Sequence, residues 1–139
     1  MKKIVIIDGQ GGRIGTQLIA ALHERDAAAE IIAIGTNSIA TANMLKSAPD
    51  AAATGENPVV VACRDADVIA GPLGIVIADS LYGEITPKMA RSVGQSRAAR
   101  VLIPMSKCDN VVVGVGEVTL GELIREAAET ILSKIKHIE

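Results

Sequence analysis

Four glycines within seven residues form the pattern with the clearest chemical meaning in this chain. They follow an apolar run at residues 3–7 and Asp8, in the order Gly9-Gln10-Gly11-Gly12-Arg13-Ile14-Gly15. A strand that turns through glycines into a helix commonly binds phosphate, because backbone N–H groups approach closely where side chains are absent and the helix N-terminus carries partial positive charge. We therefore expect a phosphate-binding loop, formed by Asp8, Gly9, Gln10, Gly11, Gly12, Arg13, Ile14 and Gly15.

The glycine spacing fits G-x-x-G-x-x-G through Gly9, Gly12 and Gly15. Ile14 stands where the third glycine of the dinucleotide pattern G-x-G-x-x-G would fall, so a tight turn that binds nothing stays open as an alternative. The carboxylate of Asp8 could hold Mg²⁺ through water or bond a ligand hydroxyl. More often such a residue pins the backbone amides of its loop, and we favour this pinning role.

Two further apolar runs also end in candidate binding residues, at the same edge of the predicted sheet. Gly35, Thr36, Asn37 and Ser38 occupy the place where an NAD enzyme usually carries an acid for the ribose hydroxyls, but no acid is present. They either bind a ribose or phosphate or cap the next helix. Gly71 and Pro72 follow another predicted strand, where they border the ligand or bend the chain.

Catalytic groups are not evident, and we leave the catalytic residues unknown. Tyr82 and Lys88 lack the Tyr-x-x-x-Lys spacing of short-chain dehydrogenases, and no His/Cys/Asp cluster has metal-ligand spacing, so no metal is expected. Cys108 has no evident activating base. Three further loop residues could touch a ligand, namely Ser80, Glu84 and Lys107.

Alternating strand and helix patterns predict a three-layer, Rossmann-like α/β fold, with a mostly parallel sheet of five to six strands covered by helices on both faces. The whole chain, 1–139, is expected to form one domain. Apolar runs predict strands at 3–7, 30–35, 57–63, 67–71 (extended by 75–77), 100–104 and 111–115. Helical spacing and capping residues predict helices at 13–25, 37–46, 87–93 and 120–135.

One connection conflicts with a parallel sheet. Only residues 64–66 separate the predicted strands 57–63 and 67–71, whereas a parallel crossover normally needs a dozen or more residues. Either the strand at 57–63 is misplaced or one edge of the sheet is antiparallel. With a strand at 57–63, the polar residues 54–57 would lie at the amino end of the sheet. They could form a subunit contact, a loop over a neighbour's pocket or a plain turn, and we favour the plain turn.

Composition limits the classes of partner. A net charge of −2 gives no general attraction for nucleic acid, and Tyr82, the one aromatic residue, provides no platform for stacking bases. No apolar run is long enough to span a membrane. With two cysteines and no CxxC motif, we expect a cytoplasmic protein with reduced thiols.

The run GQGGRIGTQLI resembles the opening loop of dihydrodipicolinate reductases. By that resemblance, Gly9, Gly12 and Gly15 would wrap the pyrophosphate of NAD(P), and Arg13 would approach its adenosine side. The reductase substrate domain has no counterpart, so its activity is not implied. More of the chain resembles a family of small bacterial Rossmann-like proteins of uncharacterised function, through IDGQGGRIG, IGTNSIATANMLK, ATGEN, GPLGIVI and GEITPKMA.

These observations favour a protein that binds NAD(P) or another nucleotide at residues 9–15. A small NAD(P)-dependent oxidoreductase with its active site at a dimer interface is one alternative. A structural or interaction protein with a glycine turn that binds nothing is the other. Because a single small domain encloses a ligand poorly, we expect a homo-oligomer.

Overall fold

Five parallel strands form the centre of the computed structural model, which describes residues 1–104 and 110–138. The strands are β1 (Lys2–Asp8), β2 (Ala29–Gly35), β3 (Ala51–Thr54), β4 (Val68–Pro72) and β5 (Ala99–Ile103), in the spatial order β3-β2-β1-β4-β5. The chain thus winds away from β1 first in one direction and then in the other. The carboxyl ends of β1 and β4 frame the crevice where such sheets usually bind ligands.

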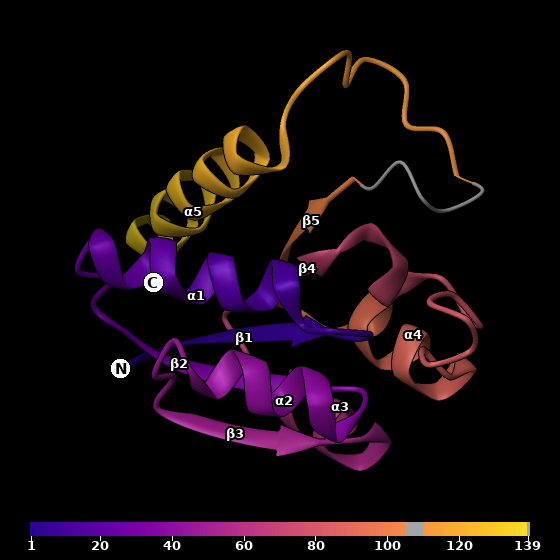
Figure 1. The fold of residues 1–139 in the computed structure, drawn as a ribbon. Helices are drawn as coiled ribbons and strands as arrows, with labels where there is room; N and C mark the ends of the chain where they lie inside the picture. Colours follow the sequence, from indigo (N-terminus) through magenta and orange to yellow (C-terminus); the bar gives the residue numbers. More distant parts are fainter. Residues whose placement is uncertain (105–109, 139) are drawn as a thin grey trace.

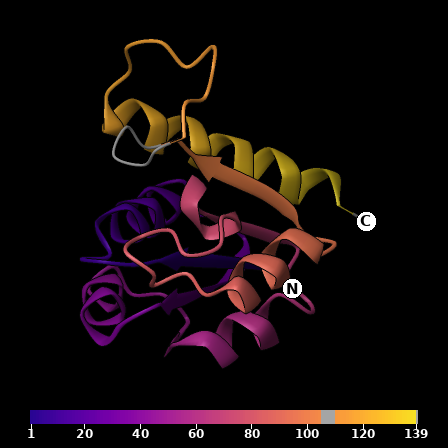
Figure 2. The same cartoon turned by 90° about the vertical axis from the view of Figure 1, so that its right-hand side faces the viewer.

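Helices cover both faces of the sheet, as Figures 1 and 2 show. One face packs against α1 (Arg13–Glu24), α2 (Ser38–Leu45) and α5 (Leu120–His137). The other packs against α3 (Glu56–Ala62), α4 (Pro87–Gln95) and the short 3-10 helix η1 (Leu73–Val76). The structure therefore confirms the predicted three-layer α/β fold.

The central strand shows why its sequence is continuously apolar. Ile4 and Ile6 pack into one helical layer and Val5 and Ile7 into the other, and all four side chains are at most 1% exposed. A strand buried on both faces needs no polar alternation.

The prediction of a strand at 57–63 is wrong. These residues belong mostly to α3, and the neighbouring strand is the alanine run of β3. Val59 and Cys63, four residues apart, are both buried, so one side of α3 packs against the core. Val61, which lies between them in the sequence, is 47% exposed. Because α3 supplies the crossover from β3 to β4, the short 64–66 connection is compatible with a fully parallel sheet.

Two other predicted strand segments are absent, and one loop lies at the other end of the sheet. The predicted extension at 75–77 is η1 and the residue after it, and 111–115 is an exposed, non-helical segment without strand pairing. Thr54 pairs with Gly35 at the end of β2, so residues 54–57 lie at the carboxyl edge rather than the amino edge. Lys107 and Cys108 lie outside the described residues.

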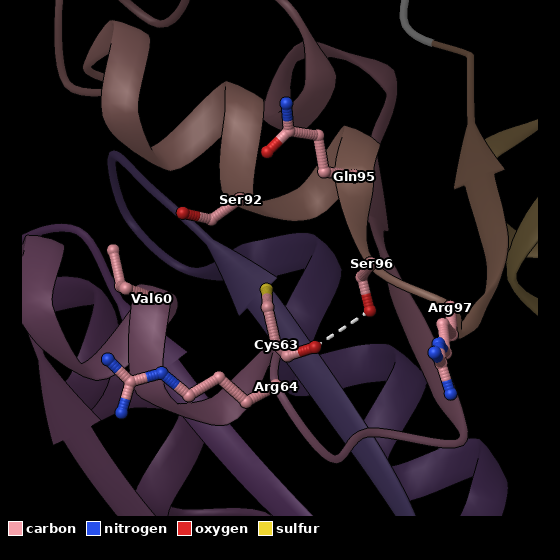
Figure 3. A pocket seen from close by; sticks show the side chains of 7 residues that line it. All are labelled: Val60, Cys63, Arg64, Ser92, Gln95, Ser96 and Arg97. Atoms are coloured by element: carbon pink, nitrogen blue, oxygen red, sulfur yellow. Dashed lines mark hydrogen bonds between the residues drawn. The ribbon is translucent and has the colours of Figure 1, made fainter.

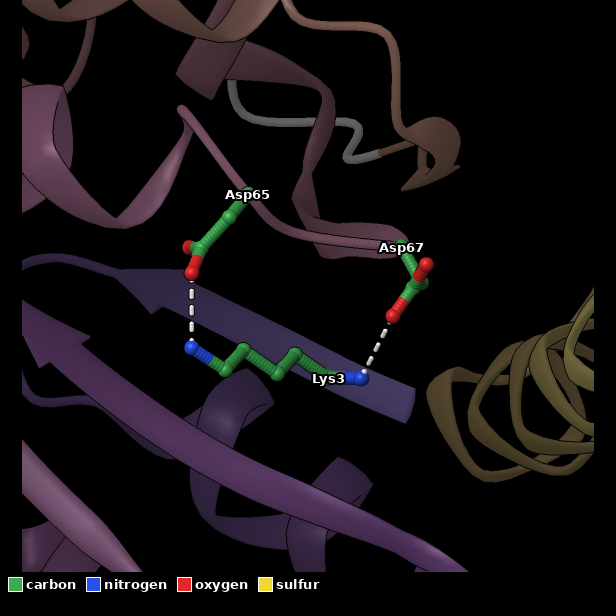
Figure 4. A network of polar contacts seen from close by, with 3 residues as sticks. All are labelled: Lys3, Asp65 and Asp67. Carbon is green, nitrogen blue, oxygen red and sulfur yellow. Dashed lines mark hydrogen bonds and ion pairs between the residues drawn. The ribbon is translucent and has the colours of Figure 1, made fainter. Parts of the chain in front are cut away.

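The amino end of the sheet is fastened by Lys3, as Figure 4 shows. Its backbone N–H donates to Asp67 Oδ2 at 2.8 Å, and its Nζ forms an ion pair with Asp65 at 2.7 Å. These contacts tie the start of β1 to the connection that leads into β4. Polar chemistry at this end therefore serves the fold.

The described segment 110–119, called the arm below, joins the β5 side of the molecule to α5 and arches away from the sheet (Figure 1). It carries exposed apolar side chains, with Val111 at 91% and Val113 at 90% exposure. Thr119 then caps α5 in the predicted capping box, in which its Oγ1 and Glu122 accept each other's backbone N–H groups.

Candidate functional site

The glycine loop turns sharply between β1 and α1. Gln10 and Gly12 adopt left-handed backbone angles, with φ of 49° and 69°, and the N–H of Gly12 donates to the carbonyl of Gly9 at 2.9 Å. A Cβ on Gly12 would lie 2.6 Å from the carbonyl oxygen of Ala40 in α2. Glycine at this position is thus required both by the turn and by the packing of α1 on α2.

Asp8 holds this loop from beneath. Its side chain is buried, and its two carboxylate oxygens accept the N–H groups of Gly9 at 2.8 Å and Gly15 at 2.7 Å. Burial raises the pKa of the Asp8 carboxyl above its ordinary value, although these hydrogen bonds act in the opposite direction. The structure confirms the predicted pinning role, which places a carboxylate under the N-terminus of α1.

The outer side of the loop keeps donors available. Among the described residues, the N–H groups of Gly11 and Arg13 have no hydrogen-bond partner. Gly11 is exposed, and a Cβ built on it meets no atom within 4 Å. Arg13 begins α1 with an exposed side chain whose positive charge would complement a phosphate.

A cleft of about 730 Å³ adjoins these donors. Most of its lining comes from the glycine loop, η1 and the loop after it, and the arm and α5 close one side: Asp8–Ile14, Pro72, Gly74, Ile77–Tyr82, Asn110 and Leu120. The volume lies in the range of small-molecule sites, and the position at the ends of β1 and β4 is the expected one for this topology. The cleft thus brings together Pro72 and seven of the predicted loop residues.

Two of the predicted glycines serve packing and do not line the cleft. A Cβ on Gly15 would collide with the sulfur of Met44, and a Cβ on Gly71 would collide with the carbonyl oxygen of Ile7. These residues let α1 approach α2 and β4 approach β1. Their small size is explained by the fold without a ligand.

The predicted cluster at the end of β2 also lies outside the cleft lining. Asn37 caps α2, since its Oδ1 accepts the N–H of Ala40 at 2.8 Å, and Gly35 leaves no room for a Cβ beside Thr41. Ser38 is the exposed first residue of α2. The capping alternative therefore describes Asn37, whose side chain makes further bonds through its amide nitrogen.

Glu84 supplies the acid that the end of β2 lacks. Its Oε1 accepts hydrogen bonds from the N–H of Gln10 at 2.8 Å, the hydroxyl of Thr36 at 2.6 Å and the Nδ2 of Asn37 at 2.7 Å. Partial burial opposes ionisation, but these bonds lower the pKa of Glu84 below its ordinary value. The sequence suggested only that Glu84 lies in a loop near the ligand, because nothing local reveals a contact across 74 residues.

The loop that carries Glu84 is tightly wound. Asp79, Leu81 and Tyr82 have φ of 65°, 55° and 56°, in the left-handed region. The loop is closed by hydrogen bonds from the N–H of Asp79 to the carbonyl of Ile85 and from the N–H of Ile85 to that of Ser80. Tyr82 is 97% exposed at its tip, so the one aromatic ring lies at the mouth of the cleft.

A second, shallower hollow of about 320 Å³ lies between the C-terminal ends of α3 and α4 (Figure 3). Arg64 and Arg97 lie on opposite sides of Cys63, whose carbonyl accepts the hydroxyl of Ser96 at 2.8 Å. Burial raises the pKa of the Cys63 thiol to about 11, so at neutral pH it is a protonated, unreactive core residue. Helix C-termini repel anions, which makes this hollow a poor phosphate site.

Within residues 1–104 and 110–138, no group of three or more His, Cys, Asp or Glu side chains could hold a metal ion. Over the same residues, no helix has the length and apolar character needed to cross a membrane.

The fold resembles that of a solved enzyme. The dodecameric FMN-dependent UbiX-like decarboxylase from Escherichia coli O157:H7 aligns with a TM-score of 0.53 and 16% identity, over 98% of this chain and 95% of that one. At this identity the likeness concerns the fold alone. This neighbour is not a dihydrodipicolinate reductase, and the likeness of the glycine loop to the reductases stays a prediction.

No curated protein matches the sequence. A family model does match, over residues 3–136, and it describes a domain of unknown function, DUF3842. The match covers almost the whole chain, including the glycine loop, the Glu84 loop and α5. The chain therefore belongs to the DUF3842 family.

Proposed function

We propose that this chain binds a nucleotide in the cleft, with a phosphate against the outer face of the glycine loop. The observation that carries the proposal is the position of the cleft: it meets the available N–H groups of Gly11 and Arg13 at the N-terminus of α1. The Arg13 side chain adds positive charge there. Backbone donors, a helix N-terminus and a cationic side chain together suit a phosphate.

The ligand class rests on two further supports. The structural neighbour is FMN-dependent, so a cofactor of nucleotide type is compatible with this fold. NAD(P) is a ligand to test because of the reductase-like loop sequence. The second candidate is a glycine turn that binds nothing. One observation supports it: Gly12 and Gly15 are already required by the contact of α1 with α2.

We also propose that the protein works as a homo-oligomer. The arm and Tyr82 border the cleft and are strongly exposed, and a second copy of the chain covering them would bury apolar surface and close the cleft. The neighbouring enzyme is a dodecamer, which is compatible with assembly of this fold.

Calorimetric titration with FMN, AMP, NAD, NADP and FAD tests the proposed site. Gly11→Asp places a carboxylate against the phosphate at a position with open space, so affinity should fall by about tenfold or more without unfolding the protein. Gly11→Asn, of the same shape without the charge, is the matched control. Gly12 is unsuitable for this purpose because any side chain there strikes α2.

Equal affinity for the Gly11→Asp and Gly11→Asn variants would contradict a phosphate at this loop. No binding of any of the five nucleotides to the native protein would favour the turn that binds nothing.

A further inference from the structure

The two sides of the glycine loop differ in the space that they offer. In dinucleotide-binding sheets the pyrophosphate crosses the glycine loop, so the two nucleotide halves of the ligand lie on opposite sides of it. The ribose of one half lies over the end of the second strand, where an acid bonds its hydroxyl. In this chain the open cleft lies on the β4 side, where Pro72, Gly74 and the loop 77–82 line it. Thr36, Asn37 and Glu84, on the β2 side, are not part of its lining.

The β2 side is filled by protein atoms directly above Gly9. A Cβ built on Gly9 would lie 2.7 Å from Thr36 Oγ1, 2.9 Å from Leu81 Cδ1 and 3.0 Å from Glu84 Oε1. Since even one added carbon has no room, a ribose packed directly against Gly9 on this side would have to displace these atoms.

The Glu84 carboxylate also uses the polar groups that a second ribose would need. One of its oxygens accepts hydrogen bonds from Gln10, Thr36 and Asn37, and Asn37 Nδ2 additionally donates to the carbonyl of Gln10 at 2.9 Å. Bonds to a carboxylate are stronger than neutral ones. A ligand entering this side would have to break several of them at once.

The loop that presents Glu84 is anchored by the two residues that follow Glu84. Ile85 is fully buried in the core, and the hydroxyl of Thr86 donates to Glu56 Oε2 at 2.5 Å. Thr86 also caps α4 by accepting the N–H of Met89 at 3.1 Å. Moving the backbone at Glu84 would therefore disturb the core and α4 as well.

From these contacts we infer that Glu84 closes the β2 side of the glycine loop and restricts the site to ligands with a single nucleotide, excluding dinucleotides. The inference rests on the proposed nucleotide site and names its ligand class. The acid that a dinucleotide enzyme would offer to ribose here bonds the protein's own loop.

Paired titrations test this selectivity, with FMN against FAD and AMP against NAD, because each dinucleotide contains the mononucleotide of its pair. For the pair that binds, the native protein should bind the mononucleotide at least about tenfold more tightly. A dinucleotide that binds as tightly as its mononucleotide would overturn the inference and leave the proposed function standing. No binding by any of the four would overturn both.

Two variants locate the cause. Glu84→Ala removes the acceptor that Gln10, Thr36 and Asn37 share and one of the three side-chain atoms that crowd Gly9. Thr36 and Asn37 are then free to turn toward a ligand, so the preference for the mononucleotide should shrink by about tenfold. Glu84→Gln keeps an oxygen acceptor of the same shape and should retain the preference. Far-ultraviolet circular dichroism establishes that both variants are folded, and a preference unchanged in a folded Glu84→Ala protein would assign the selectivity to another group.

Discussion

The buried carboxylate of Asp8 accepts the N–H of Gly15 at 2.7 Å, seven residues further along the chain. This bond joins the end of β1 to the first turn of α1 and gives the glycine loop its shape without any ligand. It also uses a donor that in other phosphate loops faces the ligand. The N–H groups of Gly11 and Arg13 have no partner among the described residues, and both residues are exposed and line the cleft, so we expect a phosphate at the exposed part of the loop.

Asp8→Asn should destabilise the fold. An amide can replace only one carboxylate oxygen, so the N–H of Gly9 or Gly15 would lose its acceptor in a buried place, at a cost of about 1–3 kcal/mol in the free energy of unfolding. Urea denaturation measures this cost. Asp65→Asn is the control, because its ion pair with Lys3 is exposed and should matter much less.

The raised pKa of Asp8 predicts a definite pH dependence. Because the folded state takes up this proton at higher pH than the unfolded state does, the Asp8 contribution to stability grows as pH falls through the folded pKa toward the unfolded value of 3.8. The free energy of unfolding of the native protein, compared with that of Asp8→Asn, should therefore increase as the pH is lowered from about 7 to about 4. A relative stability that falls over this range would mean that the hydrogen bonds outweigh burial.

Gly71→Ala should be among the more damaging single-methyl additions in this protein. The new Cβ would strike the carbonyl oxygen of Ile7, a backbone atom in the centre of the sheet that cannot move aside, at a cost of about 3 kcal/mol. Gly94→Ala is the matched control: it meets nothing within 4 Å and lies in α4, so it should stabilise by about 0.5 kcal/mol. Thermal unfolding of both variants measures the contrast, and similar melting temperatures would contradict it.

The sequence predicted the fold well wherever local pattern and burial agree. The apolar strands β1, β2, β4 and β5 and the capped helices were anticipated within a few residues. The error at 57–63 arose because a β-branched run favours a strand locally, while α3 buries only one side of it and Pro58 is tolerated in its first turn. The alanine run of β3 has weak strand preference and is held as an edge strand by pairing with β2.

The candidate site was predictable only in its local part. The Gly9–Gly15 turn follows from adjacent residues, and the pinning by Asp8 spans a short segment. The contact of Glu84 with Gln10, Thr36 and Asn37 joins segments that are 47 or more residues apart. It also depends on the left-handed backbone at Asp79 and at residues 81–83. No spacing rule in a single sequence encodes such a contact.

The arm should mediate self-association. Val111 and Val113 are each about nine-tenths exposed, and a β-branched apolar segment facing water is typical of a surface that a partner covers. Replacing both by Glu would place two like charges inside the contact and should weaken association by about tenfold or more, which sedimentation velocity over a concentration series measures.

The control for this prediction uses an apolar surface elsewhere on the molecule. Ile39 and Leu45 of α2 are 66% and 52% exposed, and α2 is not part of the cleft lining. Replacing both by Glu adds the same charge to the protein but leaves the arm intact, so association should persist. If the native protein is monomeric at every concentration, or if the α2 variant dissociates while the arm variant does not, the arm is not the contact. The arm borders the cleft through Asn110, so the arm variant should bind nucleotide more weakly as well as dissociate. Calorimetric titration of the same variant would therefore show whether ligand binding depends on assembly.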